Sequence, residues 1–382
     1  MTPDFYALWQ QQDWHDVQMH SMAFKREDVE VALHKAQRSI SHNSQLKLTD
    51  FQALLSPAAE PLLVELATTA QQLTRQRFGH TQQLFAPLYL SNLCANECSY
   101  CGFSMSQKVK RRVLTAAETE QECQALKNMG IDQVLVVTGE HERKVGMPYF
   151  RQMLPLIRRY FSSVMLEVQP LHQADYVELR QLGVDAVMVY QESYHQPSYQ
   201  HYHLKGQKAD IRWRLECPDR LGQAGVDKIG LGVLFGLANW RTDATFLAMH
   251  LLYMQQRYWR SRYSLSVPRI RPCSGGIEVQ HPLQDKHFVQ LICAFRLLSP
   301  SLEISLSTRE RAGLRDQLVP IAITSSSAGS STRPGGYAVD PEALEQFSID
   351  DNRSPVQYQQ RLQQLGLAPV LKDWDLYLGR ET

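Results

Sequence analysis

Residues 84–105 read LFAPLYLSNLCANECSYCGFSM, an apolar run that leads directly into three closely spaced cysteines. The run is short and apolar, which is typical of a strand that is buried on both faces. Cys94, Cys98 and Cys101 follow it with the spacing C-x3-C-x2-C. Three thiolates can hold a metal, but a structural zinc ion takes four protein ligands. This stretch therefore predicts a buried first strand and a metal-binding loop at its end.

Seven more short runs, rich in Val, Ile and Leu, follow along the chain. They are QVLVVTG (133–139), SVMLEVQP (163–170), VDAVMVYQE (184–192), KIGLGVLFG (228–236), YSLSVPRI (263–270), LEISLST (302–308) and VPIAITSS (319–326). Helical patterns separate most of them, at residues 115–130, 147–161, 173–183, 213–225, 243–257 and 285–298. Strands that alternate with helices pair in parallel. Eight such units predict an α/β fold, a (βα)8 barrel of the TIM type, with an open doubly wound sheet as the alternative.

We expect three regions along the chain. Residues 1–80 show helical spacing and form a helical N-terminal extension, residues 81–338 form the barrel, and residues 339–382 form a short C-terminal tail packed on the barrel. The stretch TSSSAGSSTRPGGYA (324–338) is dominated by Ser, Gly and Pro, which predicts a loop. That loop is either a flexible connection or a lid over the mouth of the barrel.

Composition narrows the function. The 382 residues carry a net charge of +1, so no overall field attracts nucleic acid or an anionic membrane. No run approaches the ~20 apolar residues that span a bilayer, and the N-terminus does not resemble a secretory signal. Seven cysteines in such a chain indicate a reducing, cytoplasmic location. Cys123, Cys217, Cys273 and Cys293 are scattered, and we expect Cys123 and Cys293 to be buried helical thiols.

The cysteine motif fits the barrel, because chemistry in such barrels lies at the carboxyl ends of the strands. No Cys or His occurs between Cys101 and Cys123, which disfavours a zinc site. A [4Fe–4S] cluster held by three thiolates instead keeps one iron open for a small molecule. The motif, with Tyr100 just before its third cysteine, resembles that of the radical SAM enzymes. This resemblance implies that the amino and carboxylate groups of S-adenosyl-L-methionine chelate the open iron, and that reduction releases a 5′-deoxyadenosyl radical.

The same resemblance implies roles for residues at other strand ends. Gly139 and Glu140 follow the second strand and correspond to the segment that holds the methionine amine. In the biotin-synthase-like subgroup, the acid at the position of Glu192 binds the ribose hydroxyls. An arginine at the position of Arg214 pairs there with the methionine carboxylate. Each residue taken alone is equally compatible with a structural role, and their shared place at strand ends favours the functional one.

Five further segments resemble the 2-iminoacetate synthase family, the tyrosine lyases of thiamine biosynthesis. They are YQESYH (190–195), HLKGQKADIRWRL (203–215), SVPRIRP (266–272), STRERAGLRD (307–316) and SAGSSTRPGGY (327–337). The resemblance implies cleavage of the Cα–Cβ bond of L-tyrosine to 2-iminoacetate (dehydroglycine) and p-cresol, with methionine and 5′-deoxyadenosine as further products. It also implies a complex with thiazole synthase, which consumes the iminoacetate.

An amino-acid substrate needs a partner for its carboxylate, and arginine binds carboxylates with two parallel hydrogen bonds. Arg269 and Arg309 follow the sixth and seventh strands, and we favour Arg309 as this partner. Ser307 and Glu310 accompany Arg309 and provide hydrogen bonds to the substrate ammonium or carboxylate. For Arg269, a salt bridge within the top of the barrel is an equally good interpretation. The sequence leaves open whether the amino N–H or the phenol O–H loses the first hydrogen.

Two other functional classes stay open. The tyrosine lyase of [FeFe]-hydrogenase maturation makes carbon monoxide and cyanide on a second cluster, for which we expect no ligands here, since no cysteine follows Cys293. A metal-stabilised scaffold protein would cleave no S-adenosylmethionine. The basic run Lys108, Lys110, Arg111 and Arg112 is either a solvated surface or a docking patch for a reduced, acidic flavodoxin-type electron donor. The oligomeric state and the surface that contacts thiazole synthase are not determined.

Overall fold

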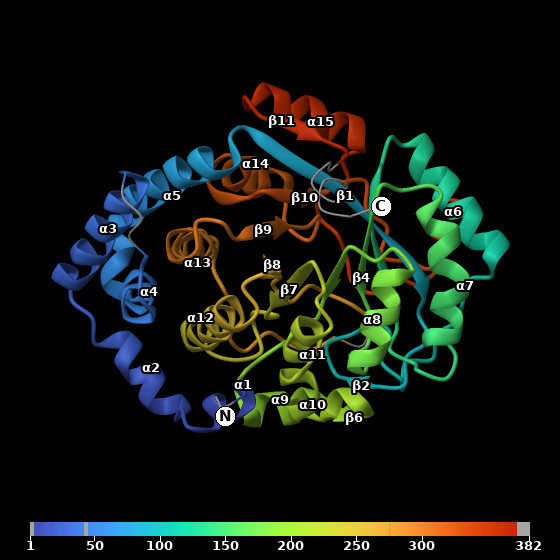
Figure 1. The fold of residues 1–382 in the computed structure, drawn as a ribbon, viewed down its shortest axis with the longest axis horizontal. Helices are drawn as coiled ribbons and strands as arrows, with labels where there is room; N and C mark the ends of the chain where they lie inside the picture. Colours follow the sequence, from blue (N-terminus) through green and yellow to red (C-terminus); the bar gives the residue numbers. More distant parts are fainter. Residues whose placement is uncertain (1–3, 42–44, 275, 373–382) are drawn as a thin grey trace.

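The computed structural model describes residues 4–41, 45–274 and 276–372, and its centre is a closed barrel of parallel strands (Figure 1). The barrel strands are β1 (Thr81–Ser91), β3 (Gln133–Thr138), β4 (Ser163–Glu167), β5 (Ala186–Met188), β7 (Lys228–Gly232), β8 (Arg262–Ser266), β9 (Glu303–Leu306) and β10 (Ser325–Ser327). Each pairs with the next in this order, and β10 returns to pair with β1. The predicted eight-stranded barrel is therefore confirmed, and the open sheet is excluded.

Helices surround the barrel. They are α6 (Ala116–Asn128), α7 (Met147–Arg158), α8 (Gln173–Gln181), α10 (Ile211–Leu215), α11 (Cys217–Gln223), α12 (Trp240–Arg257), α13 (Asp285–Leu298) and α14 (Ala312–Ala322). Thr115 and Glu118 form a capping box that starts α6, as their spacing favours. The single helix expected at residues 213–225 is divided between α10 and α11. Pro218 lies at the start of α11 and lacks the backbone N–H that would continue α10.

The eighth predicted strand is shorter than its apolar run suggested. The first half of the run at residues 319–326 belongs to α14, and only residues 325–327 form β10. Within α14, Leu314, Leu318, Val319 and Ala322 are buried, and their spacing matches one face of a helix. The apolar side chains that suggested a strand therefore pack α14 against the molecule.

The described residues up to Phe78 form helices on the outside of the barrel. They are α1 (Phe5–Gln10), α2 (Trp14–Met22), α3 (Arg26–Ser41), α4 (Leu48–Leu55), the 3-10 helix η1 (Pro57–Leu62) and α5 (Leu63–Phe78). Figure 1 shows them beside α12, α13 and α14. The Trp9 indole donates to the Tyr194 carbonyl oxygen at 3.1 Å, and Arg241 of α12 pairs with Glu60 at 2.9 Å. These contacts fix the N-terminal helices to the barrel wall.

The C-terminal part returns to the first strand. It ends, within the described residues, in α15 (Pro355–Gln364) and β11 (Ala368–Val370), and β11 pairs in parallel with Thr81–Gln83 of β1. Before α15, the chain crosses the carboxyl ends of the strands. Glu122 of α6 accepts hydrogen bonds there from the backbone N–H groups of residues 337–339. This crossing brings Gln346 and Phe347 to the barrel mouth.

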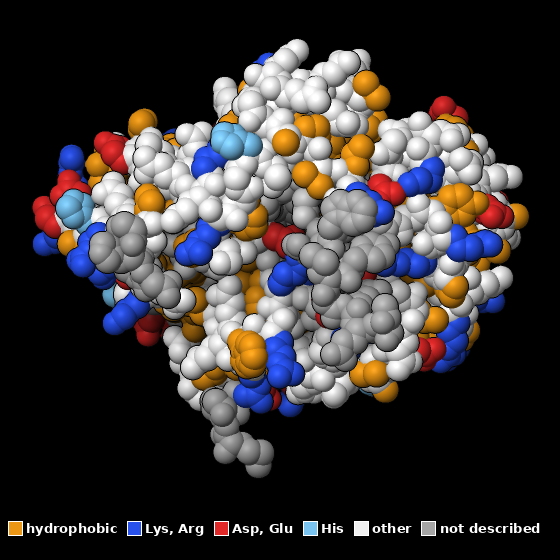
Figure 2. Space-filling view, turned by 45° about the horizontal axis from the view of Figure 1, so that its top comes forward, with side chains coloured by type: hydrophobic (Ala, Val, Ile, Leu, Met, Phe, Trp, Pro, Cys, Tyr) orange, Lys and Arg blue, Asp and Glu red, His pale blue; other side chains and the backbone are white. Residues whose placement is uncertain are grey.

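The surface carries charges of both signs. In Figure 2, Lys and Arg side chains are interspersed with Asp, Glu and hydrophobic side chains over the face shown, in agreement with a net charge of +1. None of the helices in the described part of the chain combines the length and the apolar character needed to cross a membrane.

Candidate active site

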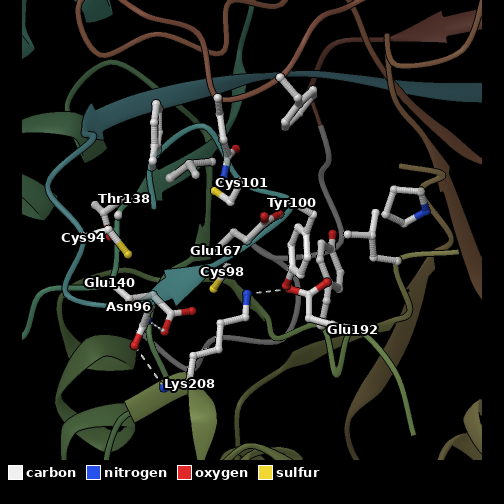
Figure 3. A pocket seen from close by; sticks show the side chains of 18 of the residues that line it. Cys94, Asn96, Cys98, Tyr100, Cys101, Thr138, Glu140, Glu167, Glu192 and Lys208 are labelled. Carbon is white, nitrogen blue, oxygen red and sulfur yellow. Dashed lines mark hydrogen bonds and ion pairs between the residues drawn. The ribbon is translucent and has the colours of Figure 1, made fainter. Parts of the chain in front are cut away.

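A pocket lies at the carboxyl ends of the strands, with about 970 Å³ of space that is partly open to solvent. The three motif cysteines line it, together with Tyr100, Gly139, Glu140, Glu192, Arg214 and Arg309. Figure 3 shows how the labelled side chains from the cysteine loop, from the ends of the strands and from Lys208 converge on this space. The structure thus brings most of the residues predicted from the sequence into one cavity.

The cysteine loop has a defined conformation. Its strand β2 (Glu97–Cys98) pairs with β6 (His203–Lys205), and the Cys98 N–H donates to Ser104 Oγ at 3.0 Å. The Arg111 guanidinium donates to four backbone carbonyl oxygens, those of Asn92, Phe103, Ser104 and Gln107, at 2.6–3.1 Å. Because Arg111 crosslinks both ends of the loop, the positions of the thiols are set before any metal binds.

The motif thiols lie in an environment of low polarity. Cys98 is buried, Cys94 and Cys101 are half-buried, and all three are free. Burial raises the pKa of Cys94 to about 11 and also raises the pKa of Cys98, so both remain thiols until a metal displaces the proton. In the part of the chain that the structure describes, no three His, Cys, Asp or Glu side chains converge closely enough for a single metal ion. A [4Fe–4S] cluster needs a wider arrangement of its thiolates.

Cys273 is closer to this site than the sequence suggested. By sequence it is one of the scattered cysteines, but its thiol donates to the carbonyl oxygen of Tyr100 at 3.1 Å. The loop that follows β8 carries it to the cysteine loop. Cys273 lies 172 residues after Cys101, so no cysteine spacing in the sequence predicts this contact. None of the other three lines the pocket, and Cys123 and Cys293 are buried in helices as expected.

One side of the pocket presents groups suited to an amino-acid moiety. A side chain at Gly139 would collide with the carbonyl oxygen of Leu93, so only glycine permits this approach of the two loops. Glu140 accepts from Asn96 Nδ2 at 2.7 Å and pairs with Arg214 at 2.6 Å. The Nε and Nη1 atoms of Arg214 are buried and have no partner among the described residues. An anionic group bound beside Arg214 would satisfy them, as the methionine carboxylate of S-adenosylmethionine would.

Glu192 lies on the next part of the wall. It has a φ of +70°, the only positive φ of a non-glycine residue in the described part of the chain, at the point where the backbone leaves β5. Its carboxylate pairs with Lys208 at 2.7 Å, as the dashed line in Figure 3 shows. Lys208 Nζ also lies 5.8 Å from the centre of the Tyr100 ring. The Tyr100 hydroxyl shares a hydrogen bond of 2.7 Å with His203 Nε2, which fixes the ring in the wall.

Of the four residues expected to bind the substrate, one lines the pocket. Arg309 follows β9, and its guanidinium stacks on the Phe347 ring at 3.3 Å. Ser307 accepts a hydrogen bond from the Arg309 N–H at 3.4 Å and is not part of the lining. Arg269 forms ion pairs with Glu310 and Asp285, and neither Arg269 nor Glu310 lines the pocket. The structure therefore places Arg269 and Glu310 in a salt bridge beside the pocket.

Sequence reasoning missed several lining residues. Glu167 is the last residue of β4, and its position at a strand end is a signal that was available. Lys208 lies in the segment 203–215, in which the family resemblance points only to Arg214. Gln346 and Phe347 come from the C-terminal tail, and no local pattern indicated that the tail reaches the pocket. The serine- and glycine-rich stretch 324–338 contributes no lining residue, and its Tyr337 donates to the Pro87 carbonyl oxygen at 2.8 Å.

Comparison with known proteins agrees with this geometry. Residues 88–246 match the Radical SAM superfamily, and residues 266–368 match the Biotin and Thiamin Synthesis associated domain. The chain is 55% identical to 2-iminoacetate synthase of Escherichia coli (strain K12) and 54% identical to that of Salmonella typhimurium (strain LT2). Both alignments cover 99% of this chain and 98% of the relative.

Among solved structures, HydG, a maturase of the [FeFe]-hydrogenase, superposes with a TM-score of 0.90 at 28% identity, over 96% of this chain and 81% of that chain. This likeness is in the fold, whereas the likeness to the 2-iminoacetate synthases extends to more than half of the residues. The shared sequence covers both chains almost from end to end. On this evidence, the chain belongs to the 2-iminoacetate synthase family of radical SAM lyases.

Proposed function

We propose that this protein cleaves the Cα–Cβ bond of L-tyrosine to 2-iminoacetate and p-cresol, and that the pocket described above is the active site. The observation that carries the proposal is the meeting, in one cavity, of three cysteine thiols, a buried arginine with two unpartnered nitrogens, and Arg309. The first two suit a cluster and its cosubstrate, and the third suits the carboxylate of an amino acid.

The residues fit the cofactors of the family. Cys94, Cys98 and Cys101 would hold a [4Fe–4S] cluster, while Arg214, Gly139 and Glu140 would hold the methionine part of S-adenosylmethionine. Bound there, this pair would supply a 5′-deoxyadenosyl radical. Glu192 would bind the ribose hydroxyls, and its ion pair with Lys208 keeps its carboxylate in place.

Tyrosine would occupy the rest of the cavity. Arg309 would bind its carboxylate, since its guanidinium makes no hydrogen bond or ion pair with any residue that the structure describes. Stacking on Phe347 holds the guanidinium in one plane, which prepares it for two parallel hydrogen bonds. Arg269 is less suited, because Glu310 and Asp285 already satisfy it.

Two protein partners and a location complete the proposal. Thiazole synthase would receive the iminoacetate, and a reduced flavodoxin-type protein would supply the electron, as the family resemblance implies. Seven free cysteines suit the reducing cytoplasm. The alternative of a carbon monoxide- and cyanide-forming enzyme is less favoured, because the likeness to HydG is 28% against 55% for the 2-iminoacetate synthases.

The test is anaerobic turnover. Reconstituted protein is incubated with S-adenosylmethionine, reductant and tyrosine, and p-cresol and glyoxylate, the hydrolysis product of iminoacetate, are measured. We expect both products in equal amounts, and none without tyrosine. About four irons per chain are expected for a single cluster. Carbon monoxide trapped by haemoglobin, or iron near eight per chain, would contradict the proposal in favour of the maturation-type reaction.

A further inference from the structure

Some charged side chains of the pocket have an ion-pair partner and others do not. Seven such side chains line it: Glu140, Glu167, Glu192, Lys208, Arg214, Arg271 and Arg309. Two pairs form within the pocket, Glu140 with Arg214 at 2.6 Å and Glu192 with Lys208 at 2.7 Å. Arg271 pairs outside it with Asp350 at 2.5 Å. One acid, Glu167, and one base, Arg309, are left without an ion pair to any described residue.

Glu167 is well placed to act on a bound molecule. It ends β4, and its carboxylate shares a hydrogen bond with Tyr190, which follows β5. The other groups whose charges reach it are Arg309 after β9, Glu192 after β5, Lys208 in η2 (Gln207–Ala209) and Tyr89 of β1. Burial raises the pKa of Glu167 to about 7, although Arg309 lowers it. The group can therefore both take up and release a proton near neutral pH.

The two unpaired groups match the two ends of an amino acid. An α-carboxylate and an α-ammonium group are attached to the same carbon atom, so their binding partners must lie near each other. Arg309 and Glu167 face the same cavity and are close enough for each to shift the pKa of the other. Bringing a zwitterion between them would pair both half-buried charges at once, which lowers the cost of leaving them unpaired.

We propose that Glu167 receives the α-ammonium group of the tyrosine substrate and accepts one proton from it. An N–H bond breaks with its electron pair left on nitrogen, and an O–H bond forms on the carboxylate, so the step needs no oxidant or reductant. The bound substrate then carries a neutral amine beside a protonated Glu167. This assignment rests on the proposed function and adds to it the residue that handles the amine.

Binding of two ligands to two proteins tests the assignment. The cluster-loaded protein is kept anaerobic with S-adenosylmethionine and without reductant, and dissociation constants are measured by equilibrium dialysis. The ligands are L-tyrosine and 3-(4-hydroxyphenyl)propionate, which lacks the amine. We expect the wild type to prefer tyrosine, and Glu167→Gln to reduce that preference by about 10- to 100-fold, the range for a hydrogen bond to a charged group. The exposed Glu342→Gln is the matched control and should retain the preference.

A pH series on the unchanged protein gives an independent readout if Glu167→Gln does not fold. Only the ionised carboxylate pairs with the ammonium group, so tyrosine affinity should rise about tenfold between pH 6 and pH 8. The affinity for 3-(4-hydroxyphenyl)propionate should not rise with it. A preference that survives Glu167→Gln, or parallel pH profiles for the two ligands, would overturn the assignment. Formation of p-cresol by the wild type tests the proposed function separately.

Discussion

The motif cysteines differ from two of the others in the surroundings of their sulfur atoms. Cys94, Cys98 and Cys101 face the pocket, whereas Cys123 and Cys293 are buried within α6 and α13 among apolar neighbours. A thiol in an apolar helix interface contributes packing, and alanine there removes a single sulfur atom. A motif thiol has a ligand role that alanine cannot fill.

Alanine at each of these five cysteines should therefore separate the two roles. We expect Cys94→Ala, Cys98→Ala and Cys101→Ala to lose the cluster and all cleavage of S-adenosylmethionine. Cys123→Ala and Cys293→Ala should keep about four irons per chain, with at most a modest loss of stability. Iron analysis and the yield of 5′-deoxyadenosine provide the measurements. Retained activity in any motif variant would show that a different residue completes the cluster.

Arg309 should affect tyrosine and not the cofactors. Removing one member of a buried charge pair costs about 3–5 kcal/mol, so Arg309→Ala should weaken tyrosine use by roughly a hundredfold or more. Cleavage of S-adenosylmethionine without tyrosine should continue, because Arg309 is not among the residues assigned to the cluster or the cosubstrate. The comparison is Arg269→Ala, which should lower stability through loss of its salt bridge and leave the tyrosine dependence intact. The opposite pattern would assign the carboxylate to Arg269.

At the scale of an element, the basic run after the cysteine loop contains two kinds of residue. Arg111 and Arg112 are not free charges, since Arg111 binds four loop carbonyls and Arg112 pairs with Glu118 and Asp340. Only Lys108 and Lys110 are exposed. The predicted docking patch is therefore reduced to these two lysines, and the arginines support the loop.

Arg111→Ala should loosen the cysteine loop. Hydrogen bonds from a charged group are worth about 1.5–3 kcal/mol each, and the variant loses several of them at once. We expect the cluster to be lost to a chelator faster than in the wild type, with the barrel still folded by circular dichroism. Arg111→Lys should not rescue it, because an ammonium group cannot reach four carbonyls in the plane of a guanidinium. Equal rates of iron loss in Arg111→Ala and wild type would show that Arg111 does not stabilise the cysteine loop.

Reversing the charge of the two exposed lysines tests electron-donor docking. In the double variant Lys108→Glu/Lys110→Glu, turnover driven by reduced flavodoxin should slow and become more sensitive to salt, since salt then screens a repulsion between the acidic donor and the introduced carboxylates. Turnover with a small chemical reductant should be unchanged. A similar loss with both reductants would indicate that the lysines serve the loop itself.

Much of the architecture could be predicted because local sequence patterns determine its strands and helices. The barrel strands are short apolar runs, and capping residues such as Thr115 mark where helices begin. Prediction failed where a contact joins distant parts of the chain. Phe347 and Cys273 reach the site from segments that have no pattern of their own, and the apolar run before β10 fits a helix face as well as a strand. Glu167 was missed although its strand-end position was visible.

At the scale of the whole molecule, His250 joins the N-terminal helices to the barrel wall. Its ring lies in α12 and stacks on Phe5 of α1 at 3.7 Å, and its Nδ1 shares a hydrogen bond of 2.9 Å with the Tyr194 hydroxyl. Burial lowers the pKa of His250 to about 3. Asp243 in the same helix behaves oppositely, because burial raises its pKa to about 7. Protonation of His250 at low pH and ionisation of Asp243 at high pH would therefore both destabilise this junction.

Replacing His250 should isolate one of these effects. The unfolded chain binds a proton at this histidine below pH ~6.5 and the folded chain does not, so the wild type loses stability as the pH falls. At pH 5 the loss is about 2 kcal/mol relative to pH 7. His250→Phe lacks this loss, and the contribution of Asp243 cancels because both proteins retain it. Urea unfolding at pH 5 and pH 7 measures the difference in free energy of unfolding between the wild type and His250→Phe. A difference that is the same at both pH values would contradict the assignment.

The pairing of β1 with β10 and β11 has a consequence for biosynthesis. During translation, β1 and the cysteine loop leave the ribosome early. The strands that close the barrel and the tail that carries Phe347 are made much later. Contacts this distant in sequence form late in folding. During that interval the three thiols are open to oxygen and to stray metal ions. The pocket that would hold the cluster is therefore complete only after residues 325–347 have been made.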